Sequence, residues 1–245
     1  MKIDPREIAE LASAQPGAPR MDMYAGIHKA MRAFMADTLL GLGRMDVDDD
    51  LEFAQAGERV MQLLDFCSSH LHHENAFVHK AMDARAPGTS AAVEAEHAEH
   101  EQAIAALSTS VAHLQACARV ARPAAAQALY RQLALFVAHN FEHVHQEETV
   151  HNDVLWTHYS DEELMGVHDA LVASIPAGEM MVVVRWLVPF MAPAERVAML
   201  ADMRQHAPEP AFAAVLNTVQ PHLTQAEWGK LMRGLGMAPA PGLVH

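Results

Sequence analysis

Two histidine–glutamate pairs in this sequence have the spacing of metal ligands on a helix. His70 precedes Glu74 by four residues, and His143 precedes Glu147 by the same interval. Four residues turn an α-helix through about 400°, so both side chains of a pair lie on one face. Imidazole is a common ligand of iron, and a carboxylate can join two cations. The two pairs therefore predict a metal site built from two helices.

The composition favours helix over sheet and argues against several kinds of partner. Of the 245 residues, 51% are hydrophobic, 6% are aromatic and 17 are histidines, a mixture typical of helical proteins. The net charge of −14 argues against nucleic acid, which is bound by basic surfaces. The longest apolar run, Met180–Val184, is much shorter than a membrane span. With two cysteines and no secretory signal, we expect a cytoplasmic protein.

Breaks in the hydrophobic pattern predict four long helices, at about residues 21–42, 51–84, 90–120 and 123–156. Connections this short make neighbouring helices antiparallel, so we expect an all-α, up-down four-helix bundle over residues 21–158. A short helix and a linker precede it in residues 1–20. Prolines punctuate residues 159–245, which predicts a C-terminal extension of short helices with a loose tail from Ala238.

Heptad spacing places both His–Glu pairs on the buried stripes of the second and fourth helices, which should continue to Phe77 and Val150. The same spacing places His28 on the stripe of the first helix and His100 on that of the third. A buried, ionised carboxylate is costly unless a cation faces it. The predicted metal ligands are His28, His70, Glu74, His100, His143 and Glu147.

Two further side chains on the third helix are alternative candidates for metal ligands. His97 lies about 60° from His100 around the helix, so it is the substitute if the register slips. Glu96 lies one turn before His100 and is either an additional ligand or a proton donor.

Four stretches of the chain resemble the hemerythrin family, in its bacterial HHE cation-binding branch. They are His28–Arg32, His70–Glu74, Glu96–Glu101 and His143–Glu148, in this order within residues 21–156. The resemblance implies two iron ions in an oxo- or hydroxo-bridged centre, with Glu74 and Glu147 as bridges. Oxygen-carrying members have two histidines four residues apart on the third helix. Here Glu96 stands in place of one of them, which argues against simple reversible oxygen carriage.

The expected function is therefore the binding of O2, NO or peroxide, in sensing, scavenging or stress response. One alternative is a di-iron enzyme that decomposes peroxide or oxidises a small molecule. Another is a protein that handles iron or repairs damaged iron centres. In these alternatives the C-terminal extension would shape a pocket, or would dock a partner protein or a second copy of the chain.

Overall fold

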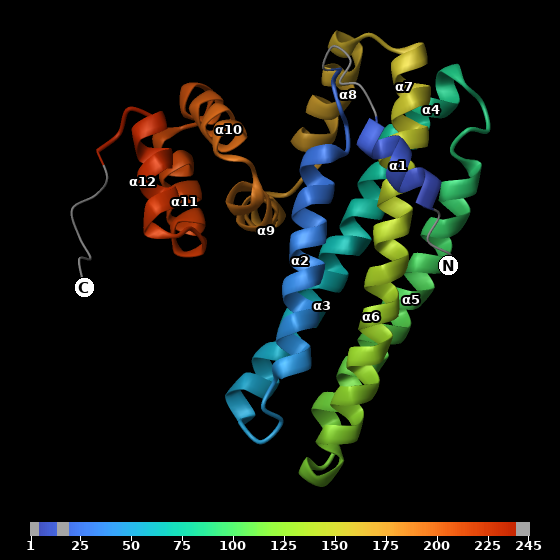
Figure 1. Cartoon of the computed structure of the whole chain (residues 1–245), viewed down its shortest axis with the longest axis vertical. Coiled ribbons are helices and arrows are strands. Elements are labelled where there is room, and N and C mark those ends of the chain that lie inside the picture. The colour runs from blue at the N-terminus through green and yellow to red at the C-terminus, as the bar shows by residue number, and fades with distance from the viewer. Residues whose placement is uncertain (1–4, 14–19, 239–245) are drawn as a thin grey trace.

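The computed structural model describes residues 5–13 and 20–238, and every regular element in these ranges is helical (Figure 1). This confirms the all-α prediction. The expected linker over residues 14–19 and the expected loose tail after Ala238 lie outside the described ranges. A short helix, α1, occupies Pro5–Ser13. The division into a bundle and an extension at residue 158 stays a prediction.

Four long helical segments form the antiparallel bundle (Figure 1). The second and fourth segments are each continuous through a π-helical turn. In chain order the elements are α2 (Ala25–Arg44), α3 (Asp50–His73), η1 (Glu74–Val78), α4 (His79–Arg85), α5 (Ala91–Ala116), η2 (Arg119–Ala121), α6 (Arg122–Gln146), η3 (Glu147–His151) and α7 (Asn152–His158). The Asp49 carboxylate caps α3 by accepting from the backbone N–H groups of Leu51 and Glu52, as expected for the acidic turn before it.

Each π-helical turn begins at one of the two glutamates and moves the buried stripe by one residue. After Glu74 the buried positions are Val78, His79 and Met82 rather than Phe77. After Glu147 the buried positions are His151 and Asn152, whereas Val150 is 59% exposed. The predicted burial of Phe77 and Val150 was therefore wrong, because a π-helical turn contains one residue more than a regular α-helical turn.

The C-terminal extension consists of α8 (Asp161–Ser174), α9 (Ala177–Leu187), α10 (Pro193–His206), α11 (Glu209–Val219) and α12 (Gln225–Gly234), with short 3-10 turns η4 (Val188–Phe190) and η5 (Gln220–His222). A capping box of Ser160 and Glu163 starts α8. On α9, Trp186 stacks on Phe34 of the bundle with ring centroids 4.2 Å apart. Val184, on the same helix, belongs to a separate core with α11 and α12. The helix α9 therefore joins the two parts (Figure 1).

Arginines hold the start of α8 against the ends of the bundle helices. Arg85 forms an ion pair with Glu163, with 2.5 Å between Nη2 and Oε1, and Arg20 pairs with Asp161 at 2.6 Å. Leu164 is fully buried in a core cluster with Tyr24 and Leu155. In the described ranges no single helix is long and apolar enough to cross a membrane. The pair α8 and Ala177–Phe190, bent by 118°, meets the length and composition test together.

Candidate metal centre

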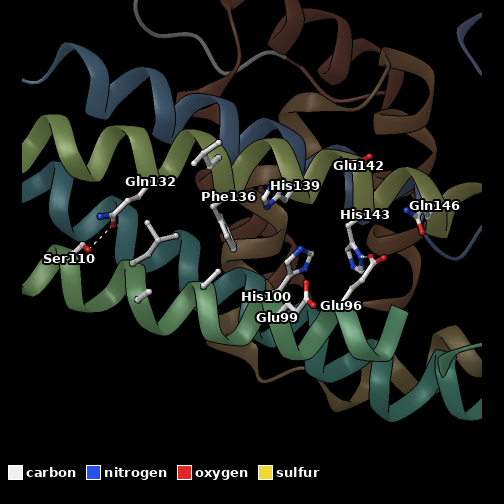
Figure 2. Close-up of a pocket in the computed structure, with 14 residues that line it drawn as sticks. Glu96, Glu99, His100, Ser110, Gln132, Phe136, His139, Glu142, His143 and Gln146 are labelled. Carbon is white, nitrogen blue, oxygen red and sulfur yellow. Dashed lines mark hydrogen bonds and ion pairs between the residues drawn. The ribbon is translucent and has the colours of Figure 1, made fainter. Parts of the chain in front are cut away.

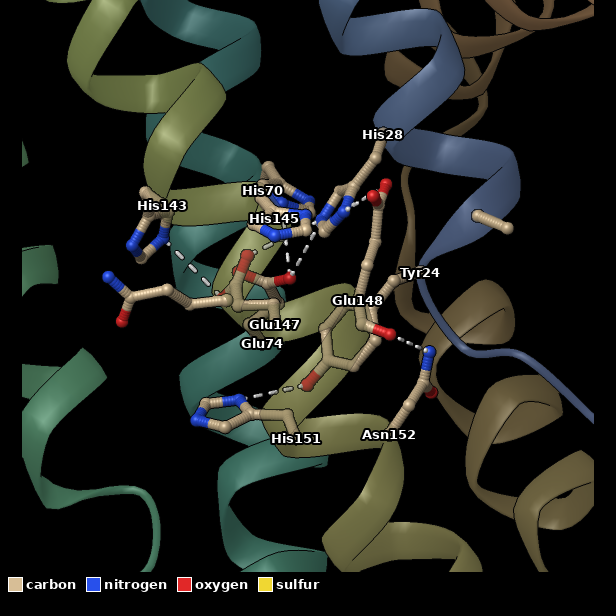
Figure 3. Close-up of polar contacts among 12 residues, drawn as sticks. Tyr24, His28, His70, Glu74, His143, His145, Glu147, Glu148, His151 and Asn152 are labelled. Atoms are coloured by element: carbon tan, nitrogen blue, oxygen red, sulfur yellow. Dashed lines mark hydrogen bonds and ion pairs between the residues drawn. The ribbon is translucent and has the colours of Figure 1, made fainter. Parts of the chain in front are cut away.

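Six buried side chains from all four bundle segments meet inside the upper half of the bundle, and Figure 3 shows five of them. Each is at most 8% exposed. Helix α2 supplies one, the segment α3–η1 supplies two, α5 supplies one, and the segment α6–η3 supplies two. They are His28, His70, Glu74, His97, His143 and Glu147.

The six side chains form two groups that share both glutamates. One group adds His28 and His70 to the glutamates, and the other adds His97 and His143. In each group the candidate ligand atoms lie within 4.8 Å of one another. This arrangement could hold two cations side by side, with the carboxylates reaching both.

Each carboxylate directs one oxygen towards each group. The Oε1 atom of Glu74 lies 3.1 Å from the Nε2 atom of His70, and its Oε2 atom lies 3.6 Å from the Nε2 atom of His97. The Oε2 atom of Glu147 lies 3.5 Å from the Nε2 atom of His28. Its Oε1 atom lies 3.5 Å from the Nε2 atoms of His97 and His143. Both glutamates are therefore oriented as bridges between the two groups.

The inward-facing atoms of this cluster have no hydrogen-bond partner. This holds for all four carboxylate oxygens and for the Nε2 atoms of the four histidines. Buried polar groups are normally satisfied, and leaving one unpaired is costly. Eight such atoms converging on one interior point fit a site that is completed by cations.

The outward-facing nitrogens of three of these histidines do have partners. The Nδ1 atom of His28 lies 3.2 Å from a carboxylate oxygen of Glu148, and the Nδ1 atom of His143 lies 2.9 Å from Glu96. The Nδ1 atom of His97 lies 2.8 Å from the side-chain oxygen of Asn75. A partner that accepts the Nδ1 proton leaves Nε2 free as the ligand atom and fixes the ring orientation.

Without cations, the two buried carboxyl groups have opposed proton affinities. Burial raises the pKa of Glu147 well above its usual value, and the negative charge of Glu74 raises it further. Burial also opposes ionisation of Glu74, but the nearby His70 and His28 outweigh it and hold the pKa of Glu74 well below its usual value. The metal-free cluster therefore holds a proton that two cations would replace.

Among the histidines, burial keeps the α5 and α6 members neutral. It lowers the pKa of His97 to about 3 and that of His143 to about 4. Both imidazoles are thus ready to coordinate a metal at neutral pH. For His28, burial opposes protonation, but the nearby carboxylates of Glu148 and Glu74 outweigh it and raise the pKa.

On the third bundle helix the structure brings His97, and not the predicted His100, into the cluster. The ring of His100 instead packs edge-on against His143, with centroids 4.5 Å apart, and its Nδ1 atom has no partner. Glu96 belongs to neither group of ligands, because its carboxylate is turned outward to the Nδ1 atom of His143. The other five predicted ligands all lie in the cluster.

An open groove of about 600 Å³ runs between α5 and α6 beside His143 (Figure 2). Polar side chains line its end near the cluster, and the aromatic ring of Phe136 lines its middle. The polar residues at that end include Glu96, Glu99, His100, His139, Glu142 and Gln146. Water and ions can therefore approach the α5–α6 side of the cluster.

Two buried histidines on the α4 and α7 side of the cluster were not among the predicted ligands. His79 and His151 form a third group of potential ligands with Glu147. Both nitrogens of His79 lack a partner, whereas the Nδ1 atom of His151 lies 3.2 Å from the hydroxyl of Tyr24 (Figure 3). His79 follows the first π-helical turn and His151 ends the second, so regular heptad spacing does not place them on the buried stripe. Their only signal in the sequence is their spacing. His79 lies five residues after Glu74, and His151 lies four residues after Glu147.

Comparison with known proteins agrees with the geometry. Residues 21–152, more than half of the chain, match the family model described as the hemerythrin HHE cation binding domain. The matched range covers the four bundle segments up to the end of the second π-helical turn and includes every residue of the cluster. Comparisons with curated proteins and with solved structures gave no match.

Proposed function

Because this chain belongs to the hemerythrin HHE cation-binding family, we propose that its buried cluster holds two iron ions and binds O2, NO or peroxide. His28 and His70 would hold one iron, and His97 and His143 the other. Glu74 and Glu147 would bridge them. The proposed role is sensing or scavenging of these small molecules under oxidative or nitrosative stress.

The orientation of the two glutamates carries this proposal. Each has one oxygen towards each pair of histidines, and no oxygen of either carboxylate has a hydrogen-bond partner. A single cation would use only half of these oxygens. The mixture of imidazole and carboxylate ligands suits iron better than the oxygen-only ligands that Mg²⁺ and Ca²⁺ prefer.

Each group has two imidazoles and two carboxylates, fewer ligands than six-coordinate iron takes, so coordination positions remain for a small molecule. Two adjacent irons supply two linked redox centres at these positions. The protein's own contribution is to bury the ligands and fix their orientation. The ion pair of Glu148 with Arg32, with oxygen–nitrogen distances of 2.5 and 2.9 Å, anchors the carboxylate that orients His28.

The groove beside His143 favours a second candidate function, the loading or release of iron. Its carboxylates and histidines line an open path to the α5–α6 side of the cluster. Glu96 lines this path and also accepts the Nδ1 proton of His143. A cation that binds Glu96 would weaken that hydrogen bond, so a cation in the groove would affect the ligand His143 directly.

Titration of the anaerobically reduced, iron-loaded protein with O2 or NO tests the first proposal. We expect a new charge-transfer absorption band that saturates at one small molecule per pair of irons. The same protein loaded with zinc is the control and should show no band. Rapid loss of iron without a band would favour the second candidate, and no response of any kind would contradict both.

A further inference from the structure

A pocket of about 350 Å³ lies between the bundle and the first two helices of the C-terminal extension. Its bundle wall includes Ile27 and Phe66, and its opposite wall includes Leu171 of α8 and Val183 of α9. The pocket reaches the metal centre, because His70 and Glu74 also line it. It therefore approaches the α2–α3 side of the cluster, which the polar groove does not line.

The walls of this pocket are mostly apolar and adaptable. Four methionines line it, namely Met23, Met180, Met191 and Met199. Methionine side chains are flexible and polarizable, so they adjust to ligands of different shape. Among the described residues that line the pocket there is no lysine or arginine, whereas Asp22, Glu74 and Glu179 contribute carboxyl groups. The site would therefore disfavour an anionic ligand.

Besides His70 and Glu74, a few polar side chains line the wall, namely Asp22, Tyr24, His73, His168 and Glu179. The Glu179 carboxylate accepts a hydrogen bond from the Ser69 hydroxyl and lies 3.7 Å from the Nδ1 atom of His73. A few polar groups in an otherwise apolar pocket are typical of small-molecule sites. The size also fits, since such sites occupy about 300–1,000 Å³, far more than a diatomic gas needs.

We propose that this pocket binds a small, uncharged and mainly apolar organic molecule beside His70 and Glu74. That the bound molecule lies beside an iron ion rests on the function proposed above, whereas its binding depends only on the pocket. A ligand in this position lies against the α2–α3 half of the centre and leaves the groove at the α5–α6 half open. The C-terminal extension would thus give the family's bundle a second, organic ligand.

Fluorine NMR of 4-fluorotoluene with the full-length protein tests the proposal, with 4-fluorobenzoate as the matched anion. We expect saturable binding of 4-fluorotoluene. The benzoate should bind roughly tenfold more weakly or worse, because burying an unpaired carboxylate is costly. The bound fluorine signal should broaden more in iron-loaded than in zinc-loaded protein, because paramagnetic iron lies close by. Equal binding of both probes, or no saturation, would overturn the proposal.

Substitutions that fill the pocket locate the binding. Val183→Phe adds volume on α9, and Val172→Phe adds it on α8 at a position already 37% exposed, where the fold should tolerate it. Each should weaken 4-fluorotoluene binding by roughly tenfold, about the effect of losing 1.4 kcal/mol of binding free energy. Val120→Phe, at a position 91% exposed and outside the pocket, is the control and should change nothing.

The outcomes separate this proposal from the di-iron proposal. Thermal unfolding of each variant shows whether it is folded. Unchanged probe binding in both folded pocket variants would contradict the pocket. Probe binding that is lost in Val172→Phe, in a protein that holds no iron, would support the pocket and contradict the proposed di-iron function. A wild-type protein that binds iron but not the probe would support the di-iron proposal and contradict the pocket proposal.

Discussion

The two halves of the metal centre offer the same kinds of ligand but differ in their surroundings. The half on α2 and α3, with His28 and His70, adjoins the apolar pocket beneath α8 and α9. The half on α5 and α6, with His97 and His143, adjoins an open polar groove (Figure 2). One half is thus placed for apolar molecules and the other for ions and water. The bundle alone makes the second environment, whereas the first requires the extension.

The hydrogen bonds behind the ligands differ in the same way. His28 lies against the carboxylate of Glu148, which is itself paired with Arg32. On the other half, the partner of His97 is the neutral amide of Asn75, and Glu96 behind His143 is 37% exposed. A charged, half-buried partner holds a proton on the imidazole more strongly than a neutral or solvated one. The two halves should therefore bind metal with different affinity and pH dependence.

Glu147→Gln should have the largest effect, because this residue belongs to both halves. We expect the iron content to fall from two ions per chain to less than one. The metal-free protein should become slightly more stable, because one of two adjacent buried carboxyl groups is removed. Iron analysis and thermal unfolding of the metal-free form check the two effects. Full iron content in the variant would contradict a bridging role.

Loss of a single histidine should empty one half. His70→Ala should remove iron from the α2–α3 half and His97→Ala from the α5–α6 half, each leaving about one tightly bound iron per chain. His100→Ala is the matched control, since His100 lies on the same helix three residues away but outside the cluster. Iron analysis and Mössbauer spectra distinguish the variants. Loss of iron in His100→Ala but not in His97→Ala would reverse the assignment.

The residues behind the ligands should have smaller effects. Glu148→Gln removes the charged partner of His28 and should lower iron affinity at that half by about 10–100-fold, the range typical for such partners. Glu96→Gln removes a more solvated partner of His143 and should have the smaller effect. Iron titrations against a competing chelator measure both. A larger effect of Glu96→Gln would mean that the groove side controls affinity.

The smallest predicted difference is in pH dependence. The pKa of His28 is raised in the metal-free fold, so a proton competes with iron there as the pH falls through neutrality. The pKa values of His97 and His143, about 3 and 4, leave those rings neutral over the same range. As the pH falls, iron affinity should therefore drop by up to about tenfold more per pH unit at the α2–α3 half than at the α5–α6 half, because the proton on the shared Glu147 affects both halves alike. Equal slopes in iron titrations at several pH values would contradict this difference.

Most of the bundle could be predicted from the sequence, because breaks and hydrophobic spacing determine helix ends. The second helix was expected over residues 51–84, and the structure places α3 through α4 over Asp50–Arg85. The π-helical turns were not predictable in this way. They replace the 3.6-residue period at Glu74 and Glu147, and no local residue type signals them. The burial of His79 and His151 follows directly from these turns.

The side chains that meet in the candidate metal centre could be predicted except on α5. His97 and His100 lie three residues apart, so both fall on one broad buried face, 1% and 8% exposed. The heptad pattern selected His100, but the packing of α5 against the neighbouring helices determines which ring reaches the glutamates. A pocket shaped by the C-terminal extension was expected only for the enzyme alternative, and its lining could not be predicted, because it forms between segments more than 100 residues apart, such as Phe66 and Leu171.

Iron quantification in the anaerobically reconstituted wild-type protein, alongside Glu74→Gln, tests the central claim most directly. The bridged arrangement predicts two irons per wild-type chain, coupled to each other in Mössbauer spectra, and loss of the coupled pair in the variant. One iron per chain, two uncoupled irons, or a coupled pair that survives Glu74→Gln would contradict it.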